Sequence, residues 1–153
     1  MSPTRGRWYR ASTMSEQSTV HVFSDDVLGD LDGVALARRI AAGEVSASEV
    51  VEAAIARARR ADTSLHAIEV DRFERGRDEA KRPSKGAFAG IPTFIKDNAA
   101  VSGLPTNHGS AALRSAPATA TDPYVQQYLS QGFVCIGKTR LSEFGLSPSN
   151  EPV

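Results

Sequence analysis

The chain has 153 residues, of which 41% are hydrophobic and 24% are charged, and its 18 basic side chains balance its 18 acidic ones. A chain of this length can bury one core, and its balanced charge gives no reason to expect nucleic acid or a membrane as a partner. No apolar stretch approaches the ~20 residues that span a bilayer. The single cysteine, Cys135, lies in an apolar run, which indicates a buried, reduced thiol in a cytoplasmic protein.

The first residues differ in composition from the rest of the chain. Residues 1–13 contain three arginines and no acidic residue, with neither the apolar core of a secretory signal nor a clear amphipathic stripe. A short transit peptide is one interpretation, and an untranslated or unstructured leader is the preferred one. We therefore predict a disordered leader over residues 1–24, with Met14 as a candidate true start, and a single domain over residues 25–153.

Two helices are expected next. Asp32 is a candidate N-cap for a helix over about residues 32–42, which Gly43 ends. A second helix starts at Ser46, because Ser46-Ala47-Ser48-Glu49 has the spacing of a capping box. Its arginines are expected on a solvated face. Its apolar stripe consists of Val50, Val51, Ala54, Ile55 and Ala58.

Strands and helices alternate through the rest of the chain. Asp122-Pro123 is typical of a helix start, with Asp122 as the cap. The order of the elements predicts an α/β fold in which helices cover a mixed, mainly parallel sheet. The expected elements are a strand over 65–70, a charged helix over 71–82, a strand ending at Lys96, a loop over 98–120, a helix from 122 and a strand over 133–136.

Lys96 ends a short apolar run that begins at Gly90, and Asp97 follows it. Burial disfavours the ammonium form of a lysine, lowers its pKa and makes the neutral amine available as a base. The alternative is a side chain that reaches solvent from the end of the strand, and residue chemistry by itself favours this second interpretation.

Residues 132–139 match the written P-loop pattern G-x-x-x-x-G-K-[ST]. A P-loop needs a strand before its first glycine and a flexible loop whose amides face a phosphate. Here a helix is expected before Gly132, and the four middle residues are bulky and apolar. We therefore expect a buried strand, and nucleotide binding is disfavoured.

Four blocks, in this order, resemble the beginning of amidase signature enzymes. The blocks are Gly90 to Asn98, Gly103-Leu104-Pro105-Thr106 with Gly109-Ser110, Gly137-Lys138-Thr139, and Glu143-Phe144-Gly145. The resemblance runs from about Asp30 to the last residue, with one departure at Arg140, where many members carry Asn. These enzymes are serine amidohydrolases with a Ser-Ser-Lys triad, so the resemblance implies that Lys96 is the catalytic lysine and that no metal or organic cofactor is needed.

Both catalytic serines of the family lie in a Gly-Ser-rich segment and the turn after it, and this segment has no counterpart here. The resemblance therefore implies the N-terminal part of one amidase domain, truncated before that segment. The implied activity of the complete enzyme is hydrolysis of a carboxylic amide to a carboxylate and ammonia or an amine. The alternatives are an inactive truncated product and the glutamine-hydrolysing subunit of a transamidation complex. The expected partners are a small-molecule amide and either further copies of the chain or amidotransferase subunits.

Overall fold

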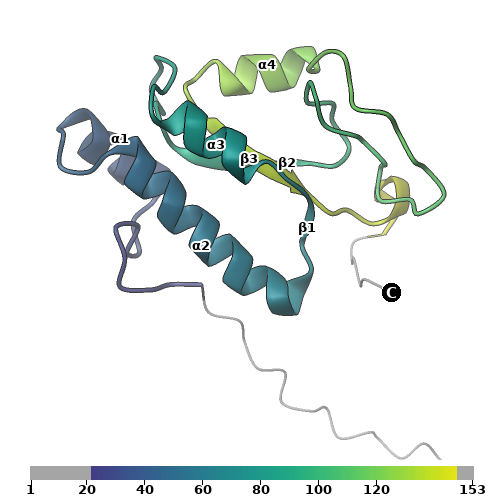
Figure 1. Ribbon diagram of the computed structural model, residues 1–153, viewed down its shortest axis with the longest axis horizontal. Coiled ribbons are helices and arrows are strands. Elements are labelled where there is room, and N and C mark those ends of the chain that lie inside the picture. Colours follow the sequence, from purple (N-terminus) through teal and green to yellow (C-terminus); the bar gives the residue numbers. More distant parts are fainter. Residues whose placement is uncertain (1–21, 148–153) are drawn as a thin grey trace, which may run out of the picture.

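The computed structural model describes residues 22–147, so residues 1–21 of the expected leader, Met14 included, lie outside the described part. The elements are α1 (Gly33–Ala41), α2 (Ala47–Leu65), β1 (Ile68–Asp71), α3 (Phe73–Ala80), β2 (Pro92–Lys96), α4 (Pro123–Leu129), β3 (Val134–Thr139) and a short 3-10 helix, η1 (Glu143–Gly145). Figure 1 shows α2 and α3 on one side of the sheet and α4 on the other, with α1 beside α2. The predicted α/β class is confirmed.

The sheet has three strands in the order β1-β3-β2. The central strand, β3, pairs antiparallel with β1 and parallel with β2. This is the mixed sheet that was predicted, with one parallel and one antiparallel pair among the described residues. Because β2 and β3 run parallel, their carboxyl ends meet at the same edge, and the segments that follow them can form a site there.

The segment that matches the P-loop pattern, residues 132–139, contains all of β3, which is longer than the expected strand over 133–136. Gly137 pairs with Asp71 on one side and with Phe94 on the other, and Lys138 is likewise flanked by residues of both neighbouring strands. A P-loop is a flexible turn whose amides remain available to an anion. These backbone groups are inside a sheet instead, which is the structure expected from their apolar composition.

Local capping signals explain where two of the helices begin. The Asp32 carboxylate accepts a 2.8 Å hydrogen bond from the Ala35 amide at the start of α1. At α2 the capping box is complete, since the Ser46 amide donates to the Glu49 carboxylate at 2.8 Å and the Glu49 amide donates to the Ser46 hydroxyl at 3.2 Å. Such caps stabilise a helix by about 1 kcal/mol each.

At α4, Asp122 occupies the N-cap position as expected, but its side chain does not cap the helix. The Asp122 side chain makes no capping hydrogen bond, and its carboxylate accepts a 2.8 Å bond from the amide of Ala100. Pro123 at the first helical position removes one amide that would otherwise need a partner. The carboxylate therefore ties the start of α4 to the loop after β2.

Both faces of the sheet are covered by buried apolar side chains, because successive residues of a strand point to opposite faces. The cluster under α2 and α3 contains Val51, Ile55, Phe73, Ala80, Val134 and Ile136. The cluster under α4 contains Ile95, Ala99, Val101, Val125 and Cys135. Full burial of a valine, isoleucine or phenylalanine side chain stabilises the fold by about 1.5–3 kcal/mol. Cys135 is a buried free thiol, as predicted.

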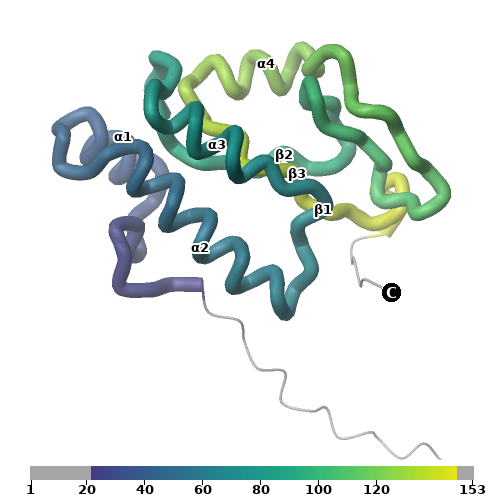
Figure 2. Tube along the Cα trace, in the orientation of Figure 1, coloured from purple at the N-terminus to yellow at the C-terminus, as the bar shows by residue number. Residues whose placement is uncertain are grey.

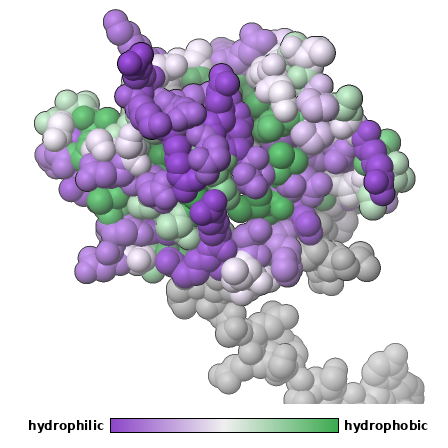
Figure 3. All heavy atoms as spheres, viewed as in Figure 1, coloured by the Kyte–Doolittle hydropathy of each residue, from purple (hydrophilic) through white to green (hydrophobic). Residues whose placement is uncertain are grey.

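The face over α2 and α3 is largely hydrophilic (Figure 3). Arg77 of α3 forms ion pairs with Glu52 and Glu74, and Lys81 pairs with Asp78 at 2.8 Å. Exposed pairs of this kind contribute about 0–1 kcal/mol each. No helix among residues 22–147 is both long and apolar enough to cross a membrane.

Two arginines of α2 were expected on its solvated face but hold the chain that precedes α1. The Arg57 guanidinium binds the Asp26 carboxylate at 2.5 and 2.8 Å and donates to the carbonyl of Gly29 at 2.7 Å. Arg60 donates to the carbonyl of Val22 at 2.8 Å. The difference arises because the acceptors come from a segment whose path the local sequence does not reveal.

Candidate active site

Lys96 is the last residue of β2, at the sheet edge where β2 and β3 both end. Its strand partner is Thr139, the last residue of β3. Ile95 packs in the cluster under α4 and Phe94 packs against the cluster under α2 and α3. Strand alternation therefore directs Lys96 away from the α4 side.

The Lys96 side chain is exposed, as residue chemistry by itself favoured. Among residues 22–147 it makes no hydrogen bond and no ion pair. The described residues leave the Lys96 amino group open to solvent. It is therefore accessible to a ligand or to another part of the protein.

The structure buries a different lysine at this edge. Lys138 and Asp97 are both 0% exposed, and the Lys138 ammonium lies 2.6 Å from Asp97 Oδ1. The same ammonium donates to the carbonyl of Pro105 at 2.8 Å and to Thr106 Oγ1 at 2.6 Å. Lys138 was expected only as part of the P-loop pattern and of the third family block, with no role in a site. An acidic residue directly after one strand and a lysine near the end of another were the available signal for this pair.

The loop after β2 and the segment after β3 lie side by side (Figure 2). The Phe144 amide donates to the carbonyl of His108 at 2.8 Å, and Ser110 Oγ donates to Glu143 Oε1 at 2.6 Å. Gly109 has φ +70°, and a Cβ there would lie 2.3 Å from the carbonyl oxygen of Leu141. Only glycine therefore fits this close approach.

All four blocks that carry the family resemblance thus meet at one edge of the sheet. The end of the first block, at Asp97, contacts the third block at Lys138. The second block contributes Thr106 to Lys138 and Ser110 to Glu143 of the fourth block. The convergence makes this edge, with Lys96 at its surface, the candidate active site.

Other chemically reactive groups do not offer an alternative centre. Burial raises the pKa of the Cys135 thiol, which keeps it protonated and poorly nucleophilic. In the described part of the chain, no group of three or more His, Cys, Asp or Glu side chains is arranged to hold a metal ion. The hydroxyls of Ser110 and Ser142 are hydrogen-bonded to Glu143 and to the carbonyl of Ser147.

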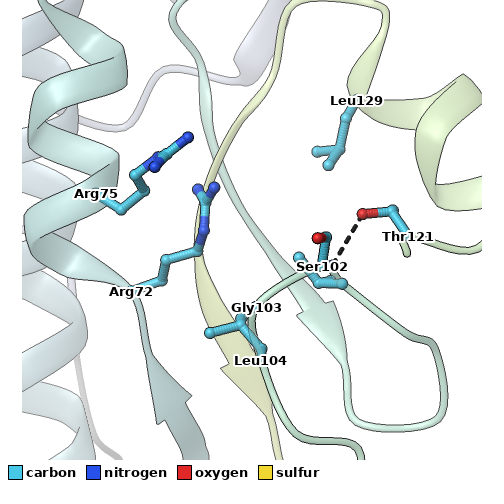
Figure 4. Close-up of a pocket in the computed structure, with 8 residues that line it drawn as sticks. Arg72, Arg75, Ser102, Gly103, Leu104, Thr121 and Leu129 are labelled. Carbon is cyan, nitrogen blue, oxygen red and sulfur yellow. Dashed lines mark hydrogen bonds between the residues drawn. The ribbon is translucent and has the colours of Figure 1, made fainter. Parts of the chain in front are cut away.

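A cavity of about 480 Å³ lies elsewhere, between the start of α3 and the loop after β2. Figure 4 shows Arg72 and Arg75 on one wall, facing Ser102, Thr121 and Leu129 on the other. The Ser102 amide donates to Thr121 Oγ1 at 2.9 Å across the second wall. Lys96 is not among the residues that line this cavity.

The arginines of this cavity have a structural role. Both guanidinium groups bind Glu79, and Arg72 also donates to the carbonyl of Cys135 at 2.9 Å. Burial alone would lower the pKa of Arg72 and raise that of Glu79, but the hydrogen bonds between them reverse both shifts. Arg72 and Glu79 therefore stay ionised, and Arg72 supplies a hydrogen-bond donor to β3 just after β1 has ended.

Comparison with known proteins identifies the relatives of this chain. The family model described as Amidase matches residues 49–153. AmiC of Mycobacterium leprae (strain TN), a protein assigned as an amidase, is 46% identical over 132 residues, which are 86% of this chain and 28% of the relative. A glutamyl-tRNA(Gln) amidotransferase subunit from Lachnospira eligens is 32% identical over 130 residues, 80% of this chain and 27% of the relative.

A solved structure of 6-aminohexanoate cyclic dimer hydrolase complexed with substrate matches with a TM-score of 0.74 and 30% identity. The match covers 80% of this chain and 26% of that one. The chain thus spans 28% of the length of the AmiC relative. The resemblance inferred from the four blocks is confirmed, and the chain belongs to the amidase family of amidase signature enzymes.

Proposed function

We propose that this chain carries the general base of an amide hydrolase, and that Lys96 is that base. The supporting observation is the position of Lys96, at the shared end of two parallel strands where the four family blocks converge. Its ammonium group is exposed and has no partner among residues 22–147. The proposed reaction converts a carboxylic amide to a carboxylate and ammonia or an amine.

In the proposed mechanism, Lys96 in its neutral form takes a proton from a bridging serine, which in turn takes the proton of a nucleophilic serine. The serine oxygen attacks the amide carbon, the C–N bond breaks, and the proton held by the lysine returns through the bridging serine to the leaving nitrogen. Water then hydrolyses the acyl-enzyme, releasing the carboxylate. Backbone amides stabilise the oxyanion in both steps.

Neither serine of this triad matches a residue of the chain. The part of the protein that bears the serines would also have to cover Lys96, because an exposed lysine is not desolvated enough to serve as a neutral base. Residues 1–153 by themselves are therefore expected to show no amide hydrolysis, which is also what an inactive truncated product would show. A small-molecule amide is the proposed substrate, and the lone buried thiol supports a cytoplasmic location.

The second candidate is the glutamine-hydrolysing subunit of a transamidation complex. Its support is the 32% identity to a glutamyl-tRNA(Gln) amidotransferase subunit. The two candidates differ in substrate and in dependence on partners. Release of ammonia from glutamine only in the presence of other subunits favours the second, and hydrolysis of a simple amide such as benzamide without partners favours the first.

The test joins residues 1–153 to the part of the M. leprae AmiC protein that lies beyond the matched region. We expect the chimera to hydrolyse simple amides, and Lys96→Ala to lower kcat by about three or more powers of ten, as for loss of a triad member. The melting temperature should be unchanged, because the side chain is exposed. Lys85→Ala, at an exposed lysine in the turn before β2, is the matched control and should keep full activity. An active Lys96→Ala chimera rejects the assignment.

A further inference from the structure

The Asp97–Lys138 pair contains the only charged side chains that are fully buried among residues 22–147. Two buried charges are costly to desolvate, and their attraction offsets this cost only when the remaining polar atoms are also satisfied. The Lys138 ammonium has three polar neighbours, since it lies 2.6 Å from Asp97 Oδ1 as an ion pair and donates hydrogen bonds to the Pro105 carbonyl and to Thr106 Oγ1. The second Asp97 oxygen accepts the Asn107 amide at 3.0 Å, and Oδ1 has the ammonium as its partner.

The two residues of the pair are each adjacent in sequence to Lys96 or to its strand partner. Asp97 follows Lys96 directly, and its own amide donates to the Thr139 carbonyl at 2.9 Å. Thr139 follows Lys138 and is the strand partner of Lys96. The ion pair therefore holds Asp97 against Lys138 at the ends of β2 and β3. The two side chains lie on the face of the sheet opposite the Lys96 side chain.

A pair of this kind adds little net stability compared with well-packed apolar residues of similar volume, so stability alone does not explain it. Its contacts instead join three segments, the ends of β2 and β3 and the loop at residues 105–107. That loop has no helix or strand to fix its course. A charged pair with four defined contacts allows one arrangement of the loop against the two strand ends, whereas apolar side chains would allow several.

We propose that Asp97 and Lys138 are positioning residues, which hold the end of β2 in the one conformation that directs Lys96 toward the reacting serine. The inference rests on the proposed function of Lys96. It assigns to Lys138 a structural connection with Lys96 and no proton transfer of its own. Thr106 contributes to the same arrangement through its hydroxyl group.

The first test measures amide hydrogen exchange in the 153-residue chain. Asp97→Asn combined with Lys138→Met removes both charges without leaving one unpaired. We expect protection of the amides at positions 97 and 99 to fall at least tenfold relative to amides inside α2. The matched control is Asp78→Asn with Lys81→Met, the same change at an exposed pair, which should leave these amides unaffected. Unchanged protection at positions 97 and 99 overturns the proposal.

The second test measures kinetics in the active chimera. The double variant should lower kcat tenfold or more with KM within twofold, because the base is misdirected while substrate binding is retained. If the double variant does not fold, Thr106→Val decides, since it removes one contact and should lower kcat about threefold with KM unchanged. A kcat equal to that of the parent overturns the proposal. If kcat is unchanged while Lys96→Ala is inactive, only this inference fails. If Lys96→Ala is active, the proposed function fails as well.

Discussion

At the scale of single residues, two lysines near the same sheet edge have opposite environments. Lys96 ends β2 and is exposed, whereas Lys138 lies one residue before the end of β3 and is completely buried. The strand register decides between them, because the irregularity between Thr93 and Phe94 sets Lys138 beside Ile95, on the face where Asp97 lies. Proximity in sequence to a strand end is therefore insufficient to identify the buried lysine.

Replacing Lys138 by Ala should destabilise the protein by about 3–5 kcal/mol, because the substitution leaves the Asp97 charge buried without a partner. The free energy of unfolding, measured by urea denaturation monitored by circular dichroism, provides the test. Lys81→Ala, which breaks an exposed pair with Asp78, should cost no more than about 1 kcal/mol. Equal losses in the two variants would show that the buried pair is not a structural requirement.

At the scale of elements, the segment before α1 is attached to α2 by one arginine. The Arg57 side chain is 11% exposed and contacts Asp26, the Ser24 carbonyl and the Gly29 carbonyl. Hydrogen bonds from Arg57 lower the pKa of the Asp26 carboxyl group. The attachment is therefore sensitive to acid.

The sign of the pH effect follows from that lowered pKa. The stabilisation by Asp26 is fully present above the pKa of the carboxyl group in the unfolded chain, about 3.9, and is lost as the pH falls from there through the lower folded value. Asp26→Asn should therefore destabilise the protein by about 1.5–3 kcal/mol at pH 7, and the difference from the parent should shrink below pH ~4. Urea unfolding at pH 7, 5 and 3 measures it.

Asp25→Asn is the control for this experiment, since Asp25 is an exposed neighbour. The control should behave like the parent chain at each pH. A difference between Asp26→Asn and the parent that is the same at pH 3 and pH 7 would contradict the role assigned to the Asp26 charge.

At the scale of the whole molecule, the described residues form a small sheet whose central strand is β3. β2 has a strand neighbour on one side only within residues 22–147, so one row of its backbone groups lies at a sheet edge. Open edges favour association with further strands.

We propose that Met14 is the functional start and that residues 22–24, which contact α2, belong to the domain expected over 25–153. A chain that starts at Met14 should melt at the same temperature as the 153-residue chain, because the residues that contact α2 are kept. A chain that starts at Asp25 should melt lower, because it loses the contacts of Arg57 with the Ser24 carbonyl and of Arg60 with the Val22 carbonyl. Each kcal/mol lost corresponds to roughly 2–4 °C for a protein of this size.

Calorimetry of the three chains measures these differences. A drop of several degrees for the chain that starts at Met14 would place structural contacts within residues 1–13. Equal melting of all three chains would show that residues 22–24 add nothing to the domain.

The local structure of this protein was readable from short stretches of sequence. The capping residues Asp32 and Ser46, the apolar stripe of α2 and the strand that ends at Lys96 all depend on side chains within about one or two turns of each other. The family blocks were readable for the same reason, since each is a short run with its own turn and strand chemistry.

Only the tertiary structure decided which polar groups meet. It paired Lys138 with Asp97, directed the Asp122 carboxylate to Ala100 in place of the helix cap, and joined Arg57 to Asp26. It also set β1 antiparallel to β3. These contacts join residues far apart in the chain, and a polar side chain takes the partner that the fold brings within hydrogen-bonding distance, because burial without a partner is costly.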